Sequence, residues 1–240
     1  MGTAMAWPLV DNGWTVHLVG TPLDDDIVEA CQRTRIHPRL KRSLPATVHI
    51  HHCSELDSVI AQADLVVSGV SSPGIDWMAE TLAKRLHSGQ MLVGITKGLR
   101  ISDDGKVIVF PDLIASSLPR RLKTSLFPAA IGGPCIAGEL AARRQTCVMV
   151  GSRDSTTAKT ITAMLGTSYY HPVPTDDLLS LEVGVALKNA YTVAVGMAYG
   201  MHTPDEAGMG MHNPAAALFA AGCQEIGFIL NLLGGNERLA

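Results

Sequence analysis

The chain has 240 residues, of which 47% are hydrophobic and 17% are charged, and its formal net charge is −3. This hydrophobic content excludes a mostly disordered protein, and the length can bury a core as one large domain or two smaller ones. The small negative charge gives no general attraction to nucleic acid or to acidic membranes, so we expect neither as a partner.

Cysteine and histidine usage points to a reducing compartment and away from a metal site. The five cysteines are dispersed and form no CxxC pair, which is typical of reduced thiols. His49 and His51 alternate as on one strand face, but no partner at ligand spacing accompanies them, so we predict no metal. The amino end lacks a secretion signal, and the apolar runs are short or interrupted by Lys188. We therefore expect a soluble, cytoplasmic protein.

Short β-rich runs alternate with helical patterns over the first 173 residues. The predicted strands cover residues 15–19, 64–70, 91–96, 129–132, 147–150 and 169–173. The predicted helices between them cover residues 58–63, 76–86 and 154–165. The run at 64–70 is apolar throughout, as expected of a buried parallel strand. The alternation predicts an α/β fold, with a doubly wound, mostly parallel Rossmann-like sheet covered by helices on both faces.

After Pro172 and Pro174 the pattern becomes helical. Residues 178–201 and 214–233 each support a long helix, and a Gly- and Met-rich segment at 199–212 separates them. We predict a Rossmann-like domain over residues 1–173 and an all-helical, partial domain over 174–240.

The sequence begins after the point where a doubly wound, dinucleotide-binding sheet is expected to start. A doubly wound sheet that binds a dinucleotide opens with a central strand, a Gly-rich turn and then a helix. Residues 2–6 already have the character of that helix, and Gly2 would be the third glycine of G-x-G-x-x-G. We therefore expect the first strand to be missing, because the chain is a fragment or its start is misassigned.

Two lysines and a glycine-rich segment are the candidate functional groups. Lys97 follows the apolar strand at 91–96, and Lys188 lies within an apolar helical stretch. Burial and a neighbouring positive charge both lower the pKa of an amine, which lets it act as a base near neutral pH. Residues 132–139 place glycines where a ligand could approach the backbone closely.

Taken in order, these segments resemble the NAD(P)-dependent glycerol-3-phosphate dehydrogenase family. The segments similar to family motifs are residues 2–6 (GTAMA), 12–18 (NGWTVHL), 96–99 (TKGL), 133–140 (GPCIAGEL), 183–190 (VGVALKNA) and 212–218 (HNPAAAL). The likeness covers nearly the whole chain, and the ordered set is more specific than any single motif.

The resemblance implies an oxidoreductase that interconverts glycerol 3-phosphate and dihydroxyacetone phosphate with NAD or NADP and so supplies phospholipid synthesis. It implies that Lys188 accepts the proton of the substrate hydroxyl and that Lys97 contacts both substrate and cofactor. The other substrate residues would be Gly133, Cys135 and Asn189, and the other cofactor residues Gly2, Thr3, Ser71 and Ala137. Cys135 stands where the family usually has Ser, Thr or Asn, which favours a packing role for the thiol.

Several alternatives remain open at this point. A related dehydrogenase such as a ketopantoate reductase, or a non-catalytic remnant that keeps only the packing, would fit the same pattern. Gly20 and Thr21 follow the strand at 15–19 instead of the acidic residue that binds a ribose hydroxyl, so cofactor choice is undecided. Arg33 and Arg35 could reach a 2′-phosphate, although a solvated helix surface is the favoured interpretation. The apolar carboxy-terminal helices make a homodimer an expectation.

Overall fold

The computed structural model describes residues 1–201 and 211–239. Most of the Gly- and Met-rich segment predicted between the two long helices, residues 202–210, lies outside the described part. The chain divides into two compact units. Unit 1 comprises Met1–Thr96 and Phe110–Leu178, and unit 2 comprises Lys97–Val109 and Leu179–Ala240. The predicted boundary lay at residue 173. The main difference is that residues 97–109 group with the carboxy-terminal segment in unit 2.

Unit 1 contains a five-stranded sheet in the order β11-β10-β9-β6-β5. Its strands are β5 (Leu65–Ser68), β6 (Met91–Gly94), β9 (Ala129–Gly132), β10 (Thr146–Ser152) and β11 (Tyr170–Thr175). All neighbouring pairs are parallel except β9 and β10, which are antiparallel. The predicted mostly parallel sheet is confirmed.

A second, two-stranded parallel sheet lies in the same unit. It pairs β1 (His17–Val19) with β4 (His49–His51). Between these strands the chain forms α2 (Asp25–Thr34) and the short antiparallel pair β2 (Ile36–His37) and β3 (Arg42–Ser43).

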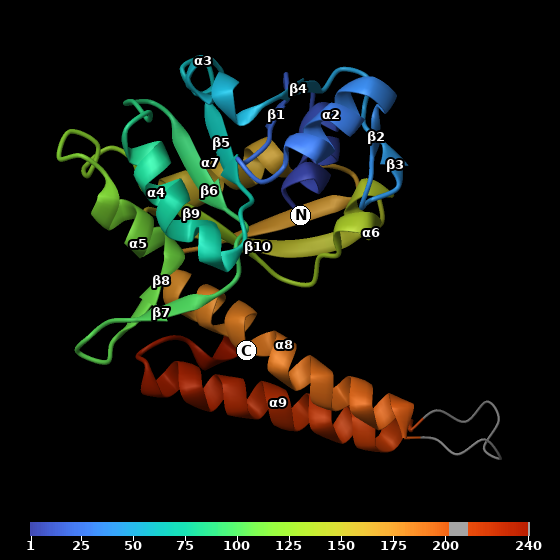
Figure 1. Cartoon of the computed structure of the whole chain (residues 1–240). Helices are drawn as coiled ribbons and strands as arrows, with labels where there is room; N and C mark the ends of the chain where they lie inside the picture. The colour runs from blue at the N-terminus through green and yellow to red at the C-terminus, as the bar shows by residue number, and fades with distance from the viewer. Residues whose placement is uncertain (202–210, 240) are drawn as a thin grey trace. The chain divides into compact units, whose positions relative to one another are not determined.

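Helices cover both faces of the five-stranded sheet. In Figure 1, α4 and α5 lie on one face and α7 on the other. Besides α2, the helices of unit 1 are α1 (Ala6–Asp11), α3 (Leu56–Ile60), α4 (Ile75–Ala83), α5 (Phe110–Ser117), α6 (Ala137–Ala141) and α7 (Ser155–Leu165). Ala4 and Met5, from a 3₁₀ turn at Gly2–Met5, join Ile161 and Leu165 in the main apolar cluster.

One polar contact ties distant segments of unit 1 together. Asp11, at the end of α1, accepts hydrogen bonds from Arg143 Nε (2.6 Å) and Arg143 Nη2 (2.8 Å). The Tyr169 hydroxyl donates to the same carboxylate at 2.7 Å. The bond from Arg143 holds the pKa of Asp11 below its ordinary value. The bidentate geometry favours the charged carboxylate, and its side chain is only 25% exposed.

Unit 2 consists of a β-hairpin and a helical pair. The hairpin joins β7 (Leu99–Ile101) to β8 (Val107–Val109), and the helices are α8 (Leu178–Gly200) and α9 (His212–Leu232). Val183, Ile226 and Leu230 form the buried centre of the pair. Leu99 and Val107 pack against this centre, so the hairpin shares the core of the helices. The helical character predicted after residue 174 is confirmed. The sequence did not predict that the hairpin belongs to the same unit.

Helices α8 and α9 also meet at a glycine. A Cβ added at Gly222 would lie 2.9 Å from Cδ1 and 3.1 Å from Cβ of Tyr191. The Tyr191 hydroxyl donates to Glu225 at 2.9 Å. Glycine at position 222 therefore allows Tyr191 to approach α9 closely.

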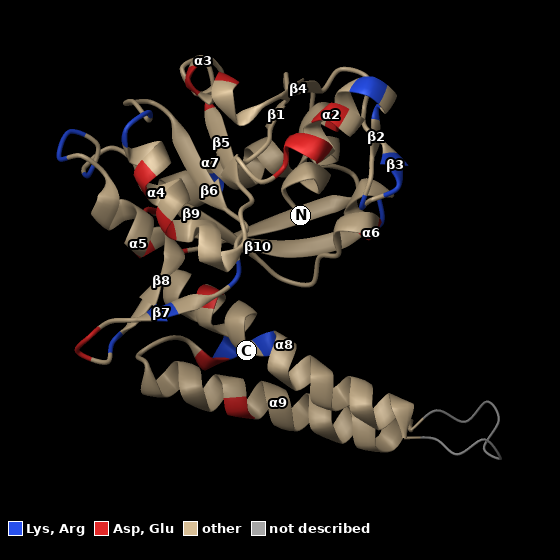
Figure 2. Cartoon of the chain, in the orientation of Figure 1, with Lys and Arg blue, Asp and Glu red and all other residues tan. Residues whose placement is uncertain are grey.

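Both helices are long and strongly apolar. They have 23 and 21 residues with mean hydropathies of 1.3 and 1.5, so by length and composition each could cross a membrane. The expectation that the apolar runs are too short or carry Lys188 does not hold for α9, whereas α8 does contain Lys188. Figure 2 shows that few charged residues interrupt either helix. This is weak evidence for a membrane span, and two such helices do not indicate a membrane protein.

Replacing Asp11 with Asn should destabilise unit 1 in a pH-dependent manner. The lowered pKa means that the carboxylate stabilises the fold above its ordinary value of 3.8 and loses this effect as the pH falls below that value. We expect a loss of about 1 kcal/mol near pH 7 and much less near pH 3, measured by urea unfolding. Asp103→Asn, at an exposed position, is the control and should change little at either pH. An equal loss at both pH values would contradict the role of the charge.

Alanine at two helical glycines should have opposite effects. Gly222→Ala forces its methyl group into Tyr191, so we expect a loss of about 1 kcal/mol or more of unfolding free energy. Gly196 lies in α8, and a Cβ added there meets nothing within 4 Å. Gly196→Ala should therefore raise the unfolding free energy by up to about 1 kcal/mol. Thermal unfolding measures both, and the same sign for the two variants would refute this packing.

Candidate functional site

The predicted site residues are distributed over the two units. Lys97, Lys188 and Asn189 belong to unit 2, whereas the glycine-rich loop and the predicted cofactor residues Gly2, Thr3, Ser71 and Ala137 belong to unit 1.

The two lysines share the unit formed by the hairpin and the helical pair. Lys97 lies two residues before Leu99, and Lys188 directly follows Leu187; both leucines pack against the Val183 cluster. Lys97 and Lys188 are half-buried, and Asn189 is exposed. The cluster thus anchors the segments that carry both amines. Two half-buried cations in one small unit suit the binding of an anion such as a phosphate.

The backbone around Lys97 is fixed on its amino-terminal side. The Thr96 hydroxyl donates to the Val70 carbonyl at 2.7 Å. Gly98 follows the lysine with φ +143°, a conformation that L side chains rarely adopt. Glycine adopts this φ without the steric cost of a Cβ.

The glycine-rich loop runs from the end of β9 into α6. Gly133 has φ +138°, and a Cβ there would lie 3.1 Å from the Val148 Cα, so only glycine fits without strain. Cys135 is half-buried and packs against the main apolar cluster together with Ala137. The packing role favoured for this thiol agrees with that contact. Ala137 begins α6, whose residues follow the loop directly.

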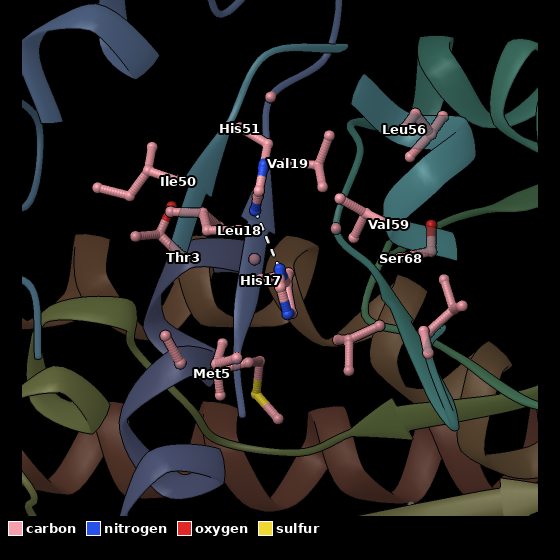
Figure 3. A pocket seen from close by; sticks show the side chains of 18 of the residues that line it. Thr3, Met5, His17, Leu18, Val19, Ile50, His51, Leu56, Val59 and Ser68 are labelled. Atoms are coloured by element: carbon pink, nitrogen blue, oxygen red, sulfur yellow. Dashed lines mark hydrogen bonds between the residues drawn. The ribbon is translucent and has the colours of Figure 1, made fainter. Parts of the chain in front are cut away.

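The amino end contributes to a large cavity within unit 1. The cavity measures about 970 Å³ and is lined by Gly2 and Thr3, by β1 and by β5. Figure 3 shows side chains of these segments around it. The backbone of Gly2 lies against Gly69, where an added Cβ would be 2.7 Å from the Gly2 Cα. Ser71 directly precedes the 3₁₀ turn at Ser72–Gly74 and is not among the residues that line the cavity.

No acidic residue directly follows β1 at residues 20 and 21. Gly20 and Thr21 follow the strand, and the Asp24 carboxylate accepts hydrogen bonds from Thr21 N (3.0 Å) and Oγ1 (2.6 Å). Arg35 Nη2 donates to the carbonyls of Pro45 (2.7 Å) and Val48 (2.9 Å), so this side chain binds the segment before β4. Arg39, which sequence reasoning missed, lies in the cavity wall.

The histidines of the small sheet contact one another. His17 Nδ1 and His51 Nε2 are 2.9 Å apart, and the His17 ring stacks on His49 with centroids 4.8 Å apart. His51 Nδ1 lies 3.0 Å from Glu55 Oε1. Burial and the neighbouring imidazoles lower the pKa of His17. Among residues 1–201 and 211–239 no group of three or more His, Cys, Asp or Glu side chains could hold a metal ion.

Family models match the chain in both halves. Residues 1–158 match the model of the NAD-dependent glycerol-3-phosphate dehydrogenase N-terminus, and residues 177–240 match that of the C-terminus. An NADP(+)-dependent glycerol-3-phosphate dehydrogenase of Archaeoglobus fulgidus is 31% identical over 100% of this chain and 69% of its own length. A glycerol-3-phosphate dehydrogenase [NAD(P)+] of Myxococcus xanthus is 28% identical over 94% of this chain and 63% of its own.

Solved structures show the same fold. A glycerol-3-phosphate dehydrogenase from Coxiella burnetii superposes with a TM-score of 0.80 at 21% identity, covering 99% of this chain and 67% of that chain. A ketopantoate reductase from Ralstonia eutropha gives a TM-score of 0.55 at 15% identity, covering 93% of this chain and 72% of that chain. The chain spans 57% to 69% of the length of its first four curated relatives. With both family models matched in order, the chain belongs to the NAD-dependent glycerol-3-phosphate dehydrogenase family.

Proposed function

We propose that the chain carries the reaction of its family, the interconversion of glycerol 3-phosphate and dihydroxyacetone phosphate with NAD(P)(H). The observation that supports this most is the grouping of Lys97 and Lys188 in one unit, each beside a leucine of the same apolar cluster. A phosphorylated triose offers an anionic group and a secondary hydroxyl or carbonyl, which two cationic side chains can bind.

The two amines would have different roles. Lys188 would take the proton of the secondary hydroxyl as glycerol 3-phosphate is oxidised and return it to the oxygen in the reverse direction. Lys97 would hold the phosphate or carbonyl by charge. When bound, the nicotinamide accepts or supplies the hydride. Gly133 would let a ligand approach the backbone, and Asn189 would border the substrate as a hydrogen-bonding amide.

Cofactor residues in unit 1 would form one end of a nucleotide site. Nucleotides bind outside the carboxyl ends of parallel strands in sheets of this kind, and Gly2, Thr3 and Gly20 lie in the wall of the cavity between such strands. Ser71, Lys97 and Ala137 would contribute from neighbouring segments. With Gly20 and Thr21 at the positions where an acidic residue would bind the ribose, and with Arg39 in the wall, this arrangement favours a 2′-phosphate, hence NADP over NAD.

The proposed setting is cytoplasmic, with the product entering phospholipid synthesis. The partners would be the small substrate and a second copy of the chain, without nucleic acid or membrane. Large apolar side chains exposed on α8 and α9, among them Val193, Met197, Phe219 and Phe228, support a homodimer through this face.

A direct assay separates this function from a non-catalytic role. Oxidation of NADPH or NADH, followed at the absorbance band of the reduced nicotinamide, should depend on dihydroxyacetone phosphate. We expect a higher kcat/KM with NADPH. Ketopantoate is the comparison substrate, and turnover of it in place of the triose would assign the related reductase activity. Cofactor binding without turnover of either substrate would assign the non-catalytic role.

Lys188→Ala should remove catalysis while the cofactor still binds. Loss of a positioned base lowers kcat by about 10²- to 10⁴-fold, whereas NADPH fluorescence on binding should hardly change. Lys159→Ala, at an exposed position of α7, is the matched control and should leave both unchanged. Normal turnover by the Lys188 variant would rule out its role as the base.

A further inference from the structure

The turn between β2 and β3 is held by a single residue, His37. Its carbonyl oxygen accepts a hydrogen bond from Lys41 N at 2.8 Å. Its imidazole Nδ1 accepts from Arg39 N and from Leu40 N, each at 3.2 Å. Pro38, the remaining residue of the turn, has no amide hydrogen to donate. Every amide hydrogen of residues 38–41 is therefore directed at His37.

The His37 ring is buried and acts as a hydrogen-bond acceptor. Its residue is only 8% exposed. Burial lowers the pKa of this ring and the positive charge of Arg39 lowers it further, whereas Asp24 acts in the opposite direction. A neutral imidazole has one acceptor nitrogen and one N–H donor, so two amides directed at Nδ1 place the ring proton on Nε2. β2 and β3 pair over only two residues each, and so short a hairpin has little stability of its own. The order of the turn therefore depends on this ring.

The turn carries positive charge into the wall of the cavity described above. Arg39 lines that cavity together with His37 and Thr21. Arg39 and Lys41 are exposed, and within residues 1–201 and 211–239 no carboxylate forms an ion pair with either of them. Leu40 packs against an apolar cluster of unit 1, so the backbone is anchored on both sides of Arg39. Figure 2 shows basic residues at this hairpin.

We propose that His37 is a positioning residue for recognition of the 2′-phosphate of NADP. It acts through Arg39, because its Nδ1 fixes the backbone that carries the guanidinium in the cavity wall. This inference rests on the proposed use of NADP, and it gives a role to a side chain that itself touches no phosphate. A guanidinium on an ordered backbone loses less conformational freedom when it binds than one on a mobile turn. The effect of His37 therefore falls on affinity for the 2′-phosphate and not on hydride transfer.

Two nucleotides without a nicotinamide isolate the 2′-phosphate. Binding of adenosine 2′,5′-bisphosphate and of adenosine 5′-monophosphate to the full chain is measured by calorimetry. The unmodified chain should bind the bisphosphate at least about tenfold more tightly, as expected for hydrogen bonds to a charged group. His37→Ala should lower this preference about threefold to tenfold and leave the affinity for the monophosphate unchanged.

Conservative variants separate positioning from general stability. In His37→Asn the amide Oδ1 can take the place of Nδ1 as acceptor, so this variant should regain most of the preference. His37→Gln places its acceptor one atom further along the side chain and should not. His171→Ala, at an exposed position of β11, is the matched control and should bind both nucleotides as the unmodified chain does.

A double-mutant cycle tests whether His37 acts through Arg39. Arg39→Ala should lose the preference for the bisphosphate, and adding His37→Ala should then cause no further loss. Steady-state kinetics with dihydroxyacetone phosphate should show a higher KM for NADPH in His37→Ala, with kcat and the KM for NADH unchanged.

Hydrogen exchange observes the two bonds to Nδ1 without any cofactor. The amides of Arg39 and Leu40 should exchange at least about tenfold faster in His37→Ala than in the unmodified chain and should slow again in His37→Asn. If His37→Ala does not fold by circular dichroism, the unmodified chain decides. Its Arg39 and Leu40 amides should be protected, and the bisphosphate should protect them further while the monophosphate does not.

Four results would overturn the proposal. They are an unmodified chain that binds both nucleotides equally, a His37→Ala variant that keeps the preference, losses from His37→Ala and Arg39→Ala that add, and an equal fall in affinity for the monophosphate. The last result would assign His37 to general folding. A preference for the bisphosphate in a chain that turns over neither substrate would leave this inference standing and contradict the proposed catalysis.

Discussion

Packing of one hairpin against two apolar helices is the constraint on which the functional account depends. Leu99 and Val107 join the buried cluster of Val183, Ile226 and Leu230, and this contact groups residues 97–109 with the carboxy-terminal helices. Without this contact, Lys97 would simply follow strand β6 of unit 1. Only Lys188 would then be part of the helical unit. Burial of apolar side chains therefore determines which charged groups share a unit.

Unit 1 is organised around its five-stranded sheet. Its five-stranded sheet is closed on both faces by helices, and the Asp11, Arg143 and Tyr169 contact joins α1 to the start of β11. The side of the sheet at β5 remains open, and the wall of the cavity there contains the glycines expected near a nucleotide. Cofactor binding is expected in this region, because nucleotides bind where parallel strands end.

Much of this architecture could be read from the sequence. The strands at 91–94 and 129–132 and the helix at 155–165 carry strong periodic or apolar patterns, and the structure places them close to the predicted bounds. The hairpin at Leu99–Val109 could not be foreseen, because its strands are three residues long and owe their order to packing on α8 and α9. The same holds for Asp11, whose partner is 132 residues away.

The grouping of Lys97 with Lys188 is tested most directly by native-state hydrogen exchange at increasing urea. We expect the amides of Leu99–Ile101 and Val107–Val109 to open together with those of α8 and α9, at one common free energy. If instead the hairpin amides open with β5 and β6 while α8 and α9 stay protected, the two lysines do not belong to one cooperative unit, and the account is contradicted.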